Sequence, residues 1–171
     1  MKRRHITALA VLVALSAVLA GCVAPGGAGV VDTSLTLEDA KATAMRMERE
    51  LAALVPADVV ASVDQDQTGV LMSCSGDRAY QWTGQTKVVL TEGATYDGAA
   101  VTENIAQTYD ASDSYRTNTD LTSDGEPRAH VIGEFGQGYL VALSVDKTFV
   151  QILSFSPCFV LPEGMWPGDD Y

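Results

Sequence analysis

Hydrophobic positions recur at helical spacing between Thr36 and Pro56. Thr36 is suited to cap a helix, and Glu38 and Asp39 would lie in its first turn, where the helix dipole favours negative charge. Pro56 is expected to stop the helix because it has no N–H to donate. The apolar positions fall three or four residues apart and form a single stripe, which we expect to pack on a sheet: Leu37, Ala40, Ala44, Met47, Leu51 and Leu54.

A second helix is predicted after Asp97, which is its expected N-cap. Val101, Ile105 and Tyr109 follow at intervals of four residues and would share one side of the helix. Small polar residues at 112–114 are expected to end it.

Most of the remaining chain alternates between apolar and polar residues, which is typical of strands with one buried face. Residues 57–67 fit either a short strand or an irregular packed segment, and residues 162–171 either lie over the domain or remain unstructured. Strands are predicted at 70–75, 80–90 (one strand or a bulged strand pair), 115–121, 129–134, 139–145 and 149–155.

The order of these elements predicts a single α+β domain over residues 36–171. Two helices would pack on one face of a mostly antiparallel sheet of about five or six strands. The two strands at 139–155 should supply much of the core, through Val141, Leu143, Val150, Ile152 and Leu153.

The N-terminus has the pattern of an export signal. Lys2, Arg3 and Arg4 precede an apolar run from Ile6 to Ala20. This run is short for a membrane span, which needs about 20 apolar residues. We therefore predict a signal peptide at residues 1–21, removed in the mature protein. Arg3-Arg4 leaves the twin-arginine export route open beside the general one.

Leu19-Ala20-Gly21-Cys22 ends the apolar run and resembles the lipobox of bacterial lipoproteins. The resemblance implies that a diacylglyceryl group joins the Cys22 sulfur and that a peptidase cuts before Cys22. Two acyl chains hold a protein firmly to a membrane. We expect the protein on the outer face of the cytoplasmic membrane, with residues 22–35 as a flexible linker. The alternatives are a secreted protein with a chance cysteine, or an uncut membrane anchor.

The chain is acidic, with a formal net charge of −11, and loss of the basic signal would make it more negative. This charge argues against nucleic acid as a partner and against electrostatic docking on anionic lipid. We expect the acidic charge to keep the exported domain soluble. The alternative is that it binds a specific cationic partner. We expect a monomer.

Three cysteines occur, and Cys22 is assigned to the lipid. In an oxidising compartment the remaining pair, Cys74 and Cys158, is expected to form a disulfide. A reactive thiol and a metal pair are the alternatives, and two lone cysteines without neighbouring histidines make a poor metal site.

No set of residues indicates catalysis, a metal or another cofactor. The mature chain has one histidine, His130, in a predicted strand, so a serine or cysteine nucleophile has a single residue that could act as its base. Tyr80 and Trp82 could line a groove for sugar or peptide, or simply belong to the core.

The lipobox, the glycine-rich linker, Tyr80-Gln81-Trp82 and Ser156-Pro157-Cys158-Phe159 together resemble small actinobacterial lipoproteins. The resemblance implies a lipid-anchored, disulfide-bonded α+β domain and brings no catalytic residues. We expect a non-enzymatic module that binds an envelope protein or polymer. The alternatives are an envelope carbohydrate-active enzyme that uses carboxylates, and a carrier of lipid or another small molecule.

Overall fold

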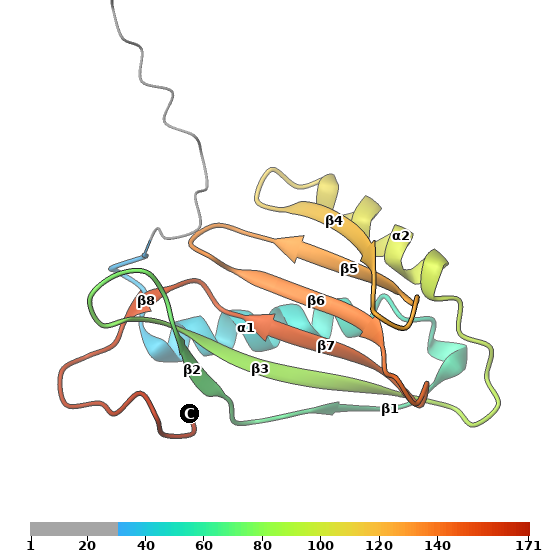
Figure 1. Cartoon of the computed structure of the whole chain (residues 1–171), viewed down its shortest axis with the longest axis horizontal. Coiled ribbons are helices and arrows are strands. Elements are labelled where there is room, and N and C mark those ends of the chain that lie inside the picture. Colours follow the sequence, from blue (N-terminus) through green and yellow to red (C-terminus); the bar gives the residue numbers. More distant parts are fainter. Residues whose placement is uncertain (1–30) are drawn as a thin grey trace, which may run out of the picture.

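The computed structural model describes residues 31–171, which form two helices and one eight-stranded sheet (Figure 1). The predicted signal peptide, Cys22 and residues 23–30 of the linker lie outside the described residues. The elements are α1 (Leu37–Ala52), a 3₁₀ turn (Ala57–Val59), β1 (Val60–Gln65), β2 (Val70–Ser73), β3 (Ala79–Leu90), α2 (Gly98–Asp110), β4 (Arg116–Leu121), β5 (Pro127–Ile132), β6 (Gly138–Leu143), β7 (Phe149–Phe155) and β8 (Phe159–Val160).

The sheet is antiparallel throughout, in the order β1-β3-β7-β6-β5-β4. Strand β3 is its longest member and pairs with β1 and β2 along one side and with β7 and β8 along the other. The predicted α+β class is confirmed, but the prediction of five or six strands was too low. The additional strands are β1, which the sequence left ambiguous, and the two-residue β8.

Both helices cover the same face of the sheet, as predicted. Their N-caps are the expected ones: the Thr36 hydroxyl accepts the N–H of Asp39 at 3.1 Å, and the Asp97 carboxylate accepts the N–H of Ala100 at 3.0 Å. Helix α1 ends at Ala52, before it reaches Pro56.

Two clusters of buried side chains fill the space between the helices and the sheet. The larger lies under both helices and includes Met47, Ile105 and Ile152. The smaller lies under the first turns of α1 and includes Trp82 and Phe159. Since this space is occupied by side chains, the carrier alternative finds no support in residues 31–171.

A buried carboxylate joins α1 to the sheet. Glu48 has no exposed surface. It accepts hydrogen bonds from Gln65 Nε2 at 2.7 Å, from Thr86 Oγ1 at 2.8 Å and from Ser154 Oγ. All three donors are neutral and come from three different strands, so this side chain fixes the position of α1 across β1, β3 and β7.

Two expectations are corrected by the structure, and one open alternative is decided. Leu153 lies on the face opposite the helices, because the buried positions of β7 are Val150, Ile152 and Ser154. Residues 79–90 form one continuous strand, which is the first of the two alternatives for this segment. The linker was expected to extend to residue 35, yet Asp32 pairs with Phe159 and Leu35 packs against the smaller cluster.

The C-terminal segment is bound to the domain. Gly69 and Tyr171 exchange two backbone hydrogen bonds, of 2.8 and 2.9 Å. Met165 and Tyr171 pack against the smaller cluster. Of the two predicted states for residues 162–171, the structure has the segment lying over the domain.

Candidate binding face

The sheet face opposite α1 and α2 carries no covering element from residues 31–171 (Figure 1). In β7 the alternation sends Gln151, Leu153 and Phe155 to this face, where each is partly exposed. We call it the open face. Its composition decides what can bind to the surface of the sheet, because the other face is buried beneath the helices.

Five apolar side chains form a stripe across the middle of the open face. Leu153 on β7 lies opposite Leu140 on β6, and Phe155 lies one position further along the same side of β7. On β2, Val70 is 50% exposed and Met72 is 47% exposed. The apolar stripe therefore consists of Val70, Met72, Leu140, Leu153 and Phe155.

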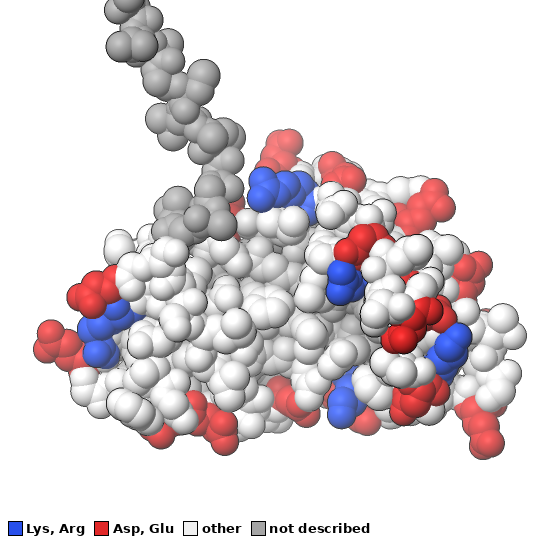
Figure 2. Space-filling view, in the orientation of Figure 1, with Lys and Arg blue, Asp and Glu red and all other residues white. Residues whose placement is uncertain are grey.

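Two hollows lie along the stripe and meet at Leu153. One, of about 280 Å³, is bordered by Val70, Met72 and Phe155. The other, of about 210 Å³, is bordered by Leu140 and Gln151. Figure 2 shows a broad uncharged area across the middle of this face, with charged side chains mainly around its edges. Such a surface suits an uncharged or apolar segment of a partner.

Amide side chains lie along the stripe. Gln85 Nε2 donates to Asp66 Oδ2 at 2.7 Å, and Gln151 Nε2 donates to Gln85 Oε1 at 3.2 Å. This series of side-chain hydrogen bonds runs across β3 and β7. It offers hydrogen-bonding groups beside an apolar surface, a combination found in protein interfaces.

A charged cluster lies on the strands near the opposite edge of the open face. Arg128 makes two hydrogen bonds to Asp120, of 2.8 and 2.6 Å, and His130 Nε2 lies 3.1 Å from Asp120 Oδ1. The hydrogen bond from Arg128, followed by that from His130, holds the pKa of the Asp120 carboxyl well below its usual range.

Within residues 31–171, no hydroxyl or thiol group hydrogen-bonds to the His130 ring, whose partner is Asp120. His130 lies between Asn118 on β4 and Leu140 on β6 in the register of the sheet. Neither neighbour has a nucleophilic hydroxyl or thiol, and a histidine base must hydrogen-bond to its nucleophile. The hydrogen bond between His130 and Asp120 fits a structural role for His130.

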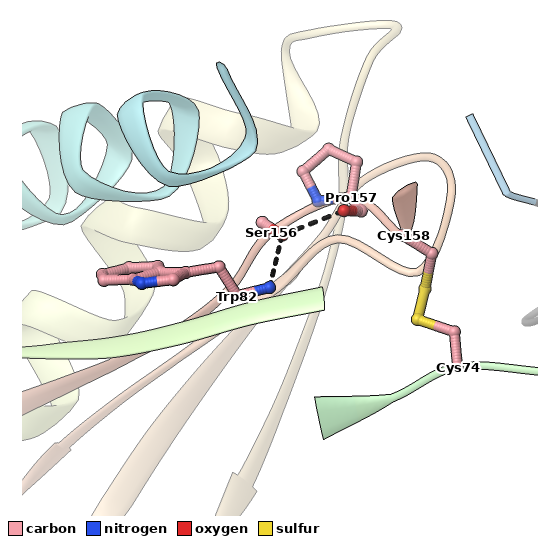
Figure 3. The surroundings of a disulfide bond; sticks show 5 residues. All are labelled: Cys74, Trp82, Ser156, Pro157 and Cys158. Atoms are coloured by element: carbon pink, nitrogen blue, oxygen red, sulfur yellow. Dashed lines mark hydrogen bonds between the residues drawn. A yellow bond between two sulfur atoms is a disulfide. The ribbon is translucent and has the colours of Figure 1, made fainter. Parts of the chain in front are cut away.

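Cys74 and Cys158 form a disulfide, with their Cα atoms 6.3 Å apart (Figure 3). Cys74 follows β2 and Cys158 precedes β8, the two short strands that flank the beginning of β3. Nearby, the Ser156 hydroxyl accepts the N–H of Trp82 at 2.9 Å and donates to the Pro157 carbonyl at 2.9 Å. The disulfide and this hydroxyl together hold both sides of β3 at this end.

The described chain enters the domain at the same corner. The N–H of Asp32 donates to the carbonyl of Cys158 at 2.8 Å. The point where the linker joins the domain is therefore directly next to the disulfide.

The two aromatic residues proposed as groove-lining lie on the helix side. Trp82 has no exposed surface, and Tyr80 packs partly buried against the same smaller cluster. The structure thus favours the alternative that both belong to the core.

Carboxylates occur in several surface hollows, as the composition leads one to expect. Glu92 and Glu126 border a hollow of about 430 Å³, where Glu126 is bound by Lys147 at 2.7 Å. Since carboxylates are spread over the acidic surface, their presence here does not by itself indicate a glycosidase. No three His, Cys, Asp or Glu side chains among residues 31–171 are placed to hold a metal ion. No helix in that range has the length and hydrophobicity to cross a membrane.

Comparison of the chain with protein-family models, curated proteins and solved structures finds no match. Two features of the protein itself, the geometry of the open face and the N-terminal sequence, therefore indicate its function.

Sequence reasoning did not identify the open face. A signal was present in Phe149-Val150-Gln151-Ile152-Leu153-Ser154-Phe155, where apolar residues occur at both odd and even positions. A strand with one solvated face normally alternates between apolar and polar. The excess of apolar residues on the second face of β7 could have indicated a binding surface.

Proposed function

We propose that this protein is a lipoprotein held by lipid on Cys22 at the outer face of the cytoplasmic membrane, and that its domain is a non-enzymatic binding module of the cell envelope. The module binds an envelope protein through the open face. The observation that carries this proposal is the apolar stripe, which leaves Val70 and Met72 about half exposed on an uncharged surface.

The lipobox sequence supports the anchor, and the fold supports its use as a tether. The linker reaches the domain beside the Cys74–Cys158 disulfide, at one end of the sheet. When the domain is held at this corner, no part of residues 31–171 covers its open face. The partner is expected to present an apolar, uncharged segment that covers Leu153.

The anchor is tested with Cys22→Ser in cells of the source organism. We expect the variant to leave the membrane fraction and to lack the mass of a lipid-modified N-terminus. A variant that stays in the membrane and is processed like the wild type would contradict the anchor.

The binding face is tested by placing a photo-crosslinking residue at position 153 in the full chain in cells. The matched control carries it at position 107, which is exposed on α2. We expect a discrete crosslinked protein from position 153 and none of that size from position 107. Leu140→Arg, combined with the crosslinker at 153, should abolish the product because it places a charge in the stripe. Equal crosslinking from both positions, or none, would overturn the proposal.

A further inference from the structure

Strand β4 is an edge of the sheet and pairs only with β5. Thr122 donates its N–H to the Glu126 carbonyl at 2.9 Å, so even-numbered positions at this end direct their backbone groups toward β5. In an antiparallel strand, alternate residues direct both backbone groups to the same side. The odd positions therefore point away from the sheet, and Thr117 fits this pattern because its N–H bonds to Asp110 Oδ1 at 2.9 Å.

Thr119 and Leu121 carry the remaining outward N–H groups of β4. Neither N–H bonds to another group of residues 31–171, and both residues are exposed. Proteins commonly protect such an edge with proline, lysine or a bulge. This half of β4 has none of these features, and it ends in Leu121, which is 64% exposed.

A groove of about 460 Å³ runs between this edge and α2. Its helix side is formed by the small residues Ala99, Thr102 and Ala106 together with Glu103. Its strand side is formed by Thr119, Asp120, Leu121 and Pro127. The small side chains of α2 leave room beside β4 for the apolar side chains of an added strand.

The groove has an acidic border. Glu103 lines it from α2 and Asp120 lines it from β4. Asp110 is exposed at the last position of α2, and Asp113 is exposed just after the helix. A second copy of this chain would bring the same acidic edge into contact, and like charges in an interface are costly. The charge favours a foreign segment with lysine or arginine.

We propose that the α2–β4 groove binds an extended peptide segment of another protein, which adds to β4 as a further strand. Its backbone pairs with Thr119 and Leu121, an apolar side chain enters the groove beside Ala106, and a basic side chain lies near Glu103. Recognition of this kind takes affinity from main-chain hydrogen bonds and specificity from the pocket. The site is separate from the open face and does not depend on the lipid anchor.

The test uses the domain as it occurs in the processed chain, with a synthetic probe peptide of alternating valine and threonine flanked by lysines. Amide hydrogen exchange is followed by NMR. We expect added peptide to slow exchange at Thr119 and Leu121, while Thr117, already bound to Asp110, changes little. The control is the same peptide, N-methylated at the amides that would pair with β4. We expect this control to bind at least about tenfold more weakly than the unmethylated peptide.

Two variants locate the site. Ala106→Arg fills the groove and adds a positive charge to it, and should weaken binding about tenfold or more. Thr108→Arg adds the same charge to an exposed position of α2 outside the groove and should leave binding unchanged. Equal binding of both peptides, or equal effects of both variants, overturns the proposal. So does protection of Thr119 and Leu121 that rises with protein concentration without peptide, because it would show pairing between copies.

Discussion

The indole Nε1 of Trp82 donates a hydrogen bond to the main-chain oxygen of Tyr171 at 3.1 Å. Strand β3 and the last residue of the sequence are thereby joined, and Gly69 bonds to the same oxygen at 2.8 Å. The C-terminal segment therefore covers the smaller cluster, in which Trp82 has no exposed surface.

Removal of residues 166–171 should expose Trp82. The chain has two tryptophans, and the matched control is full-length Trp166→Phe, so that both proteins contain Trp82 alone. We expect the truncated protein to show red-shifted emission, stronger quenching by a polar quencher and a lower midpoint of thermal unfolding. An unchanged emission maximum would show that the segment does not cover the indole.

Gly84→Ala should disturb the same cluster from the sheet side. A Cβ at this position would lie 2.1 Å from the Trp82 ring, so the ring must shift. Overpacking of this kind typically costs about 1–3 kcal/mol. Gly138→Ala is the control, because its Cβ would meet only the Val131 carbonyl at 3.9 Å. Urea unfolding of both variants measures the difference, and equal free energies of unfolding would contradict the close fit of Trp82 over Gly84.

Variants at Glu48 should separate its hydrogen-bonding role from its packing. In Glu48→Gln, an NH₂ group replaces one of the two acceptor oxygens and faces a hydrogen-bond donor. A buried polar group left without a partner in this way costs about 1–3 kcal/mol. Glu48→Ala leaves Gln65, Thr86 and Ser154 without this acceptor and adds a cavity, so its loss of stability should be larger. Ser154→Ala removes one donor and should cost less than either. The free energy of unfolding in denaturant tests this order, and a stable Glu48→Ala would refute it.

Reduction of the disulfide should destabilise the domain. Cys74 and Cys158 are 84 residues apart, and the chain-entropy model gives about 4 kcal/mol for a loop of this size. We expect neither cysteine to react with an alkylating reagent in the native protein until it is reduced. Cys74→Ser with Cys158→Ser should lower the free energy of unfolding by a similar amount. Rapid labelling of the native protein would contradict the bond.

The sequence predicted what depends on local pattern. The caps at Thr36 and Asp97 and the stripe through Val101, Ile105 and Tyr109 follow from short-range chemistry, and the structure confirms them. The pairing of Cys74 with Cys158 followed from the number of cysteines and is also confirmed.

The sequence could not predict what depends on distant partners. Leu153 was assigned to the core because its hydrophobicity is visible locally, whereas the face it occupies is set by the register of β7 against β3 and β6. The buried position of Glu48 was missed for the same reason, because its three donors come from separate strands. The open face and the β4 edge are likewise products of sheet order, which no short segment specifies.

Alkaline pH should unfold the domain through its buried tyrosines. Burial is the main cause that raises the pKa of Tyr96 and of Tyr109 from 10.0 to about 12. Burial also raises the pKa of Tyr139. The folded state therefore keeps these protons at pH values where the unfolded chain releases them. Their contribution to stability is complete below about pH 10 and is lost as the pH rises toward 12.

The measurement is the free energy of unfolding from neutral pH upward, with tyrosinate absorbance followed in parallel. Wild type should lose stability steeply above pH 10, the ordinary pKa of tyrosine. Tyr96→Phe with Tyr109→Phe removes two of the ionising groups and should flatten this loss, while a comparison at neutral pH measures any packing effect of the missing hydroxyls. If the double variant loses stability as steeply as wild type, ionisation of Tyr96 and Tyr109 does not drive the alkaline transition. The phenols would then be titrating in the native state, which their burial should prevent.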